Sequence, residues 1–274
     1  MGTSAPRRGT GWTIVALGLL LLVLSPVIWL LMMSLKREVD ALAMPPRLIF
    51  RPTLDNYLQL LEPRFLRPLA NSVVVAVVTT TLSLGLGVPA AYALSRRLTR
   101  GAGGISFWIL ATRMAPPIAF GIPFFLAYRW LGWLDTLGGL VVIYLTFNLS
   151  LVIWMMRTVF DAIPPSLEEA AYIDGASVGQ ALRAVLLPVA APGIIATAIL
   201  CFLNAWNDFF FALVLTRSTA MTAPVAIVNF MHYAGWDWGR ITAGSIVVAL
   251  PVLAFAWPVR RYLVSGLTAG AVKG

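Results

Sequence analysis

Six long runs of apolar residues, separated by shorter polar segments, dominate the chain. They lie near 12–34, 71–94, 105–130, 139–160, 193–215 and 241–259. Each run is long enough to cross about 30 Å of hydrocarbon as a helix, which takes roughly 20 residues. The alternating polar and apolar positions of a membrane barrel are missing from the sequence. The pattern therefore predicts an all-α polytopic membrane protein, with six transmembrane helices in a single domain, 1–274.

Composition supports this prediction and excludes several soluble classes. Hydrophobic residues make up 59% of the 274 residues and charged residues 11%, whereas a globular chain is about 45–50% apolar and about 25% charged. Such an excess excludes a soluble enzyme, a disordered protein and a disulfide-stapled secreted domain. The single cysteine, Cys201, lies in an apolar run, so no disulfide framework or Cys/His metal site can be built from it.

The chain has a net charge of +9, which in a soluble protein would suggest binding to nucleic acid. The basic residues are scattered, so we interpret them as topology signals and lipid contacts and expect no nucleic-acid partner. Both termini are predicted to be cytoplasmic, because one side then collects Arg7, Arg8, Arg96, Arg97, Arg100, Arg157, Arg183, Arg260 and Arg261. The external loop 35–70 disagrees, since it also carries basic residues.

The longest predicted cytoplasmic segment, 161–192, begins with strong local signals. Pro164-Pro165 should end the preceding helix. Ser166 with Glu169 three residues later predicts a capping box. A short helix is therefore expected over 167–173.

A second short helix is predicted in the same segment. Asp174-Gly175 should break the first helix, because glycine accepts a positive φ. Ser177–Gln180 is another possible capping box, for a helix to about Leu187 that Pro188 and Pro192 would end. The result is a helix–turn–helix outside the bilayer. From these signals alone, an ordinary pair of amphipathic helices on the membrane surface is an equal alternative.

The residue string of this segment resembles the cytoplasmic signature loop of ABC-importer permeases. The matching positions are Glu169, Ala170, Ala171, Asp174, Gly175, Ala176, Leu187, Pro188 and Pro192. Asn204–Asp208 resembles the corresponding run of carbohydrate-uptake permeases. Ser34–Lys36 and Gly266–Gly274 are similar to the maltose-type second subunit of that group. Arg260-Arg261 departs from the family pattern, in which Gln-Arg is more usual.

The resemblance implies a type I ABC-importer permease fold and a mechanism. The 161–192 loop would be a coupling helix docked on a separate ATPase subunit, and the coupling residues would be Glu169, Ala170, Ala171, Asp174, Gly175, Ala176, Leu187 and Pro188. The implied partners are a second permease subunit, two ATPase subunits that carry ATP and Mg, and an external solute-binding protein that docks on loops 35–70 and 216–240. The implied location is a bacterial inner membrane, and the implied substrate is a sugar or polyol.

Polar side chains at membrane depth are candidates for the substrate pathway, because such groups usually mark a pathway or a helix–helix contact. They are Arg113, Tyr144, Asn148, Asn204, Trp206, Asn207 and Asp208. Amides and carboxylates can bond sugar hydroxyls, whereas adhesion between helices is an equal alternative. Pro116-Pro117 predicts a break in the third span. We also expect Arg113 to pair with Asp208, since either charge alone in hydrocarbon is penalised.

The sequence offers no sign of catalysis by this chain. It contains no G-x-x-x-x-G-K-[ST] motif, and no nucleophile–base or metal-ligand constellation. We therefore expect no catalytic residue, no metal and no cofactor bound here. The alternative function is a self-contained secondary transporter, which would need a coupling-ion site and an internal repeat that are not evident. A membrane-embedded enzyme is a third, disfavoured class.

Overall fold

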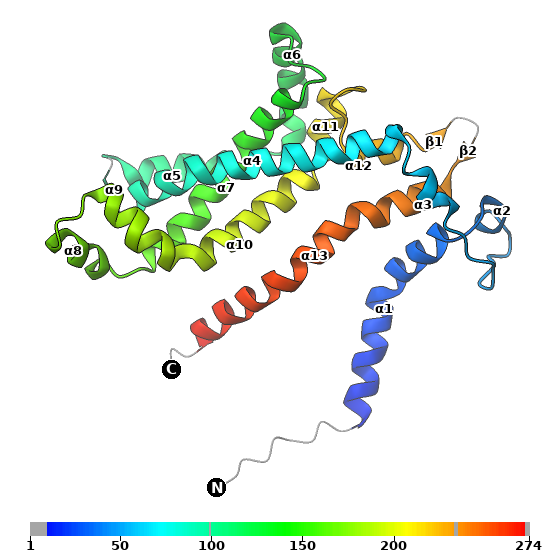
Figure 1. Cartoon of the computed structure of the whole chain (residues 1–274), viewed down its shortest axis with the longest axis horizontal. Helices are drawn as coiled ribbons and strands as arrows, with labels where there is room; N and C mark the ends of the chain where they lie inside the picture. Colours follow the sequence, from blue (N-terminus) through cyan, green and yellow to red (C-terminus); the bar gives the residue numbers. More distant parts are fainter. Residues whose placement is uncertain (1–9, 99, 233–234, 272–274) are drawn as a thin grey trace. The chain divides into compact units, whose positions relative to one another are not determined.

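The computed structural model describes the backbone of residues 10–98, 100–232 and 235–271, and the side chains of 11–98, 100–231 and 235–255. Arg7, Arg8, the side chains of Arg260-Arg261 and the end of the 266–274 stretch lie outside these ranges. The helices are α1 (Thr10–Ser34), α2 (Glu38–Ala41), α3 (Asp55–Gln59), α4 (Pro63–Ser95), α5 (Ala102–Ala111), η1 (Pro117–Phe120), α6 (Gly121–Leu131), α7 (Leu137–Asp161), α8 (Ser166–Ile173), α9 (Val178–Ala181), η2 (Leu182–Leu186), α10 (Leu187–Trp206), α11 (Phe210–Leu215), α12 (Ala223–Val228) and α13 (Trp238–Ala271) (Figure 1). The short strands β1 (Met231–His232) and β2 (Gly235–Trp236) pair antiparallel, a small departure from the purely helical prediction.

Within the described residues, five helical stretches are long and apolar enough to cross a membrane. They are Gly11–Ser34, Pro63–Ser95, Leu137–Asp161, Val178–Trp206 and Trp238–Phe255. The predicted third span is instead divided into α5 and α6, which are shorter apolar helices. The backbone of 112–116 between them is not helical, because Pro116 and Pro117 supply no N–H for a continuous ladder. The predicted break in the third span, 105–130, is therefore confirmed.

Two other predicted boundaries also differ from the structure. Helix α4 begins at Pro63 rather than near residue 71, since proline is well tolerated at a first helical position. The predicted span 193–215 is two helices, α10 and α11. They are separated by Asn207–Phe209, where the Asp208 carboxylate accepts the N–H groups of the next turn.

The contacts of the chain group into two compact units, Met1–Pro63 with Ile227–Val247 and Arg64–Ala226 with Val248–Gly274. In the first unit, a buried amide ties the end of α1 to α3. Asn56 Nδ2 donates to the backbone oxygens of Ser34 and Lys36, each at 2.8 Å. The Ser34–Lys36 stretch thus has a structural role in holding the segment that follows α1.

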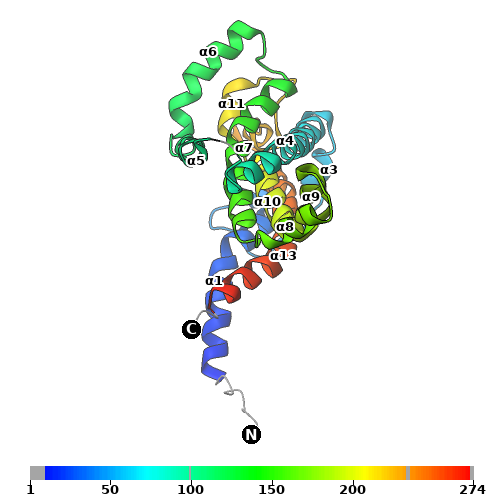
Figure 2. The same ribbon diagram turned by 90° about the vertical axis from the view of Figure 1, so that its left-hand side faces the viewer.

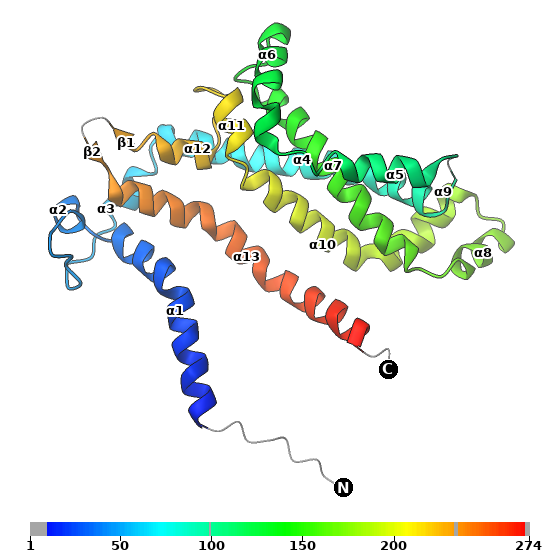
Figure 3. The same cartoon turned by 180° about the vertical axis from the view of Figure 1, so that it is seen from behind.

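The second unit is built on α4, α7 and α10, which lie side by side (Figures 1 and 3). Small residues let α7 approach both neighbours. A Cβ added at Gly87 of α4 would come within 2.6 Å of Val152, and one at Gly193 of α10 within 2.6 Å of Val159. Helix α6 extends away from this bundle (Figure 2), and α8 and α9 lie at its opposite end. The bundle therefore positions two features, a helix–turn–helix and a polar cavity.

Candidate functional site

The segment between α7 and α10 forms the predicted helix–turn–helix. Helix α8 covers Ser166–Ile173, within one residue of the prediction. Gly175 has φ +85°, the left-handed conformation that favours glycine, so the predicted break is confirmed. The second capping box is also confirmed. The Gln180 N–H donates to Ser177 Oγ at 3.4 Å, and the Ser177 N–H donates to Gln180 Oε1 at 2.8 Å.

The first capping box does not form. Pro165 precedes α8 in a helical conformation, φ −59° and ψ −26°, and makes no side-chain cap. Ser166 is therefore already the first helical residue. A side-chain cap requires the extended backbone that Ser177 has, with φ −71° and ψ 163°.

The prolines at 188 and 192 do not end the second helix. Helix α9 continues through the π-helical turn η2 directly into α10. The Leu187 N–H bonds the Leu182 oxygen, five residues back. This wider turn accommodates Pro188, which has no N–H of its own, in the first turn of α10. Pro192 lies inside α10.

Most of the predicted coupling residues are accessible. Glu169, Ala170, Asp174, Gly175 and Pro188 are exposed, Ala171 and Ala176 are half-buried, and Leu187 packs against the core. An apolar side chain, Ile173, stands on the same short helix and is 86% exposed. Small, acidic and apolar groups together on an accessible helix suit contact with another protein.

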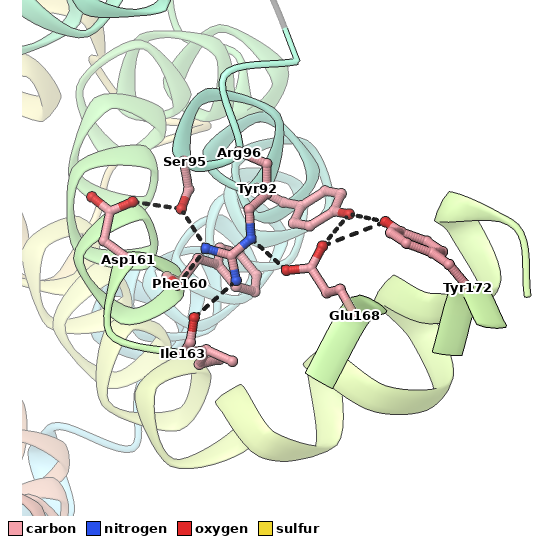
Figure 4. Close-up of polar contacts among 8 residues, drawn as sticks. All are labelled: Tyr92, Ser95, Arg96, Phe160, Asp161, Ile163, Glu168 and Tyr172. Carbon is pink, nitrogen blue, oxygen red and sulfur yellow. Dashed lines mark hydrogen bonds and ion pairs between the residues drawn. The ribbon is translucent and has the colours of Figure 1, made fainter. Parts of the chain in front are cut away.

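The sequence analysis missed Glu168, the neighbour of Glu169. It is the buried residue of α8, and its carboxylate forms an ion pair with Arg96, just beyond α4 (Figure 4). Its other oxygen, Oε2, accepts from the Tyr92 hydroxyl at 2.9 Å. The available signal was the pair of adjacent glutamates. Successive helical residues point about 100° apart, so two adjacent glutamates can have different environments, here one buried and one exposed.

Arg96 binds more than the carboxylate. Its Nη1 donates to the backbone oxygen of Phe160 at 3.0 Å, and its Nη2 to that of Ile163 at 3.1 Å (Figure 4). Phe160 lies in the last turn of α7, where carbonyls lack helical partners. Beside it, Ser95 Oγ donates to Asp161 Oδ1 at 2.5 Å. One guanidinium thus connects the ends of α4 and α7 with α8.

A second feature is a cavity of about 160 Å³ in the same unit. Its lining is Arg113, Ala115, Pro117, Tyr144, Phe147, Asn148, Asn204, Ala205, Asp208 and Phe211. Five of the predicted pathway residues, Arg113, Tyr144, Asn148, Asn204 and Asp208, are therefore brought together. The break in the third span places Arg113 and Pro117 on its wall.

Contacts inside this cavity differ from the expected charge pair. Among the described residues, Arg113 and Asp208 form no ion pair. Asp208 instead accepts the Phe211 N–H at 3.1 Å and the Ala212 N–H at 3.3 Å. Asn204 Nδ2 donates to Asn148 Oδ1 at 2.9 Å, which joins α10 to α7. These two asparagines thus serve helix adhesion and line the cavity as well.

Two predicted pathway residues do not line the cavity. Trp206 is buried, stacks on Phe202 and donates from its indole N–H to the Val248 oxygen at 3.0 Å. Asn207 caps the C-terminus of α10. The structure therefore gives Trp206 a packing role rather than a place facing the cavity.

Comparison with known proteins agrees with this architecture. The model of the family described as "Binding-protein-dependent transport system inner membrane component" matches residues 83–263. The trehalose transport system permease protein of Mycobacterium tuberculosis is 39% identical, over 98% of this chain and 99% of its own. The trehalose/maltose transport system permease protein of Thermococcus litoralis is 36% identical, over 93% of each chain.

A solved structure resembles the chain along most of its length. It is the crystal structure of a bacterial ABC transporter involved in the import of the acidic polysaccharide alginate. The match has a TM-score of 0.76 and 28% identity, and covers 95% of this chain and 99% of the other. Nothing in these comparisons supports a self-contained secondary transporter. With its divided third span, its exposed helix–turn–helix and these relatives, the chain belongs to the family of binding-protein-dependent transport system inner membrane components.

Proposed function

We propose that this chain is a maltose-type permease subunit that forms half of the pathway for a sugar or polyol, driven by separate ATPase subunits through the 161–192 segment. The observation that carries the proposal is the accessible α8–α9 pair, with Glu169 and Ala170 on its exposed surface. The similarity to a trehalose and to a trehalose/maltose transport system permease supports the substrate class.

The proposed assembly contains a second permease subunit, two ATPase subunits that bind ATP and Mg, and an extracytoplasmic solute-binding protein. The binding protein would dock on the 35–70 and 216–240 loops. The cavity supports a second permease, because about 160 Å³ is less than the roughly 300–1,000 Å³ of most ligand sites. The second permease subunit would supply the rest of the cavity wall. The chain acts as a single permease domain in a bacterial inner membrane, contacts lipid, and has both termini in the cytoplasm.

Affinity purification tests this assembly. The tagged chain would be purified from its host in mild detergent, and the co-purifying proteins identified by mass spectrometry. We expect a P-loop ATPase, a second six-span permease and a solute-binding protein. A panel of sugars tested on that binding protein then names the substrate. A chain that purifies alone and transports in liposomes without ATP would overturn the proposal.

Two substitutions test the coupling segment directly. We expect Glu169→Lys and Gly175→Glu to abolish ATP-driven uptake while the chain still inserts at normal levels. The first reverses the charge of an exposed anchor. The second forces a side chain into φ +85°, although the position itself is open. Arg100→Glu, which reverses the charge of an exposed residue outside the proposed docking surfaces, is the matched control. Normal uptake by both variants would contradict the coupling assignment.

A further inference from the structure

We infer that Arg96 is a positioning residue that makes α8 move together with the ends of α4 and α7, so that motion of the coupling segment reaches the cavity. This inference rests on the proposed function. Its first support is burial. Glu168 is the residue that α8 buries, and the Arg96 and Glu168 side chains are only 14% and 6% exposed. The buried contact of α8 with the bundle is therefore centred on this pair, and the Tyr172 hydroxyl of α8 adds a hydrogen bond with the Tyr92 hydroxyl at 3.2 Å.

The second support is the number of elements that meet at one side chain. The Arg96 guanidinium pairs with Glu168 of α8 and donates to the backbone oxygens of Phe160 and Ile163. The Tyr92 hydroxyl, one helical turn earlier on α4, also bonds Glu168. Figure 4 shows these groups converging between the helix ends. If α8 moves as a partner closes on it, these bonds carry α4 and α7 with it.

The third support is chemical. Three acceptors in different directions require the planar fork of arginine, which lysine cannot reproduce although it keeps the charge. Arg96→Lys therefore keeps the positive charge but removes the set of hydrogen bonds that connects α4, α7 and α8. The neighbouring Arg97 is exposed and lies beyond the end of α4, so Arg97→Gln is a matched control that changes one positive charge nearby.

The experiment reports on the cavity without any knowledge of the substrate. Cys201 is fully buried and would be replaced by alanine, and Ala115, which lines the cavity, by cysteine. The full complex with its co-purified ATPase is then labelled with N-ethylmaleimide, with and without trapping by ATP and vanadate. ATP hydrolysis is measured in parallel.

We expect trapping to change the labelling rate at position 115 roughly tenfold in the parent and in Arg97→Gln, because the cavity changes its exposure. In Arg96→Lys the rate should stay at its nucleotide-free value while ATP hydrolysis continues. Tyr92→Phe, which removes one bond to Glu168, should give a smaller response than the parent.

Three outcomes would contradict either the role of Arg96 or the proposed function on which it rests. A full labelling response in Arg96→Lys would show that Arg96 does not transmit motion. Loss of ATPase binding in Arg96→Lys would assign the residue to shaping the docking surface, and would also overturn it. If the parent complex itself shows no response to nucleotide, the proposed function fails rather than the role of Arg96.

Discussion

At the scale of single residues, Asp135 fixes the loop between α6 and α7. Its carboxylate accepts backbone N–H groups from Arg217–Ala220 at 2.9 to 3.2 Å. Partial burial alone would raise the pKa of Asp135. The hydrogen bonds from these N–H groups outweigh burial, and the pKa lies well below its ordinary value of 3.8.

This depressed pKa predicts a pH dependence of stability. The contribution of Asp135 is complete above pH 3.8, and is lost as the pH falls below that value toward the folded pKa. We expect Asp135→Asn to lower the thermal midpoint at neutral pH and to flatten the acid limb of its pH profile. Glu62→Gln, at an exposed carboxylate, is the control. Identical profiles for Asp135→Asn and the parent would show that the loop is held by other contacts.

Two features with a local role were predicted correctly, although the equally local capping box at Ser166 was not. Gly175 and the Ser177–Gln180 cap depend on neighbours within a few positions, and both were predicted. Arg96 and Glu168 are 72 positions apart, so their pairing depends on how α4 and α8 pack. The expected Arg113–Asp208 pair was wrong for a related reason. Asp208 instead accepts the backbone N–H groups of Phe211 and Ala212 in the first turn of α11, a position that depends on where that helix begins.

At the scale of elements, the two candidate caps give a controlled comparison. Ser177→Ala removes a cap that is formed and should cost the α9 turn about 1 kcal/mol. Ser166→Ala alters a serine that caps nothing. Amide hydrogen exchange should therefore speed up over 178–181 roughly fivefold in Ser177→Ala and remain unchanged at α8 in Ser166→Ala. The reverse pattern would mean that the first capping box forms in solution.

Helix existence was predictable, whereas several helix ends near prolines were not. Apolar runs of about 20 residues identified the spans because bilayer thickness sets their length. Proline positions were ambiguous, since a proline can end a helix or sit in its first turn. Pro116-Pro117 breaks the third span, but Pro188 is absorbed by the π-helical turn η2. Only the surrounding backbone distinguishes these cases.

At the scale of the whole molecule, the predicted orientation can be tested by cysteine labelling. A Cys201→Ala background leaves no cysteine in the sequence. We expect Glu62→Cys to react with a membrane-impermeant maleimide in spheroplasts, and Glu169→Cys to react only after permeabilisation. The positions of short-loop arginines motivate this expectation. Labelling of Glu169→Cys in intact spheroplasts would show that α8 lies outside the cell, opposite to the prediction. The helix could then not contact a cytoplasmic ATPase.

Membrane character and family membership followed from the sequence, because composition and the signature loop are properties of the chain itself. The cavity was predicted in part. Polar residues at membrane depth identified five of its lining side chains, but also included Trp206, which packs inside the bundle. An amphipathic side chain gives no sign in sequence of which way it faces.

The continuity of α9 and η2 with α10 makes α9 one end of a rod. Val178–Trp206 is a single helical stretch of 29 residues, and at 1.5 Å per residue it is roughly 43 Å long. A rod of that length magnifies small rotations. A tilt of about 10° about one end displaces the other by about 7 Å. Because Asn204 stands near the far end and lines the cavity, a tilt of a few degrees at the α9 end would shift this part of the cavity wall by a few ångströms.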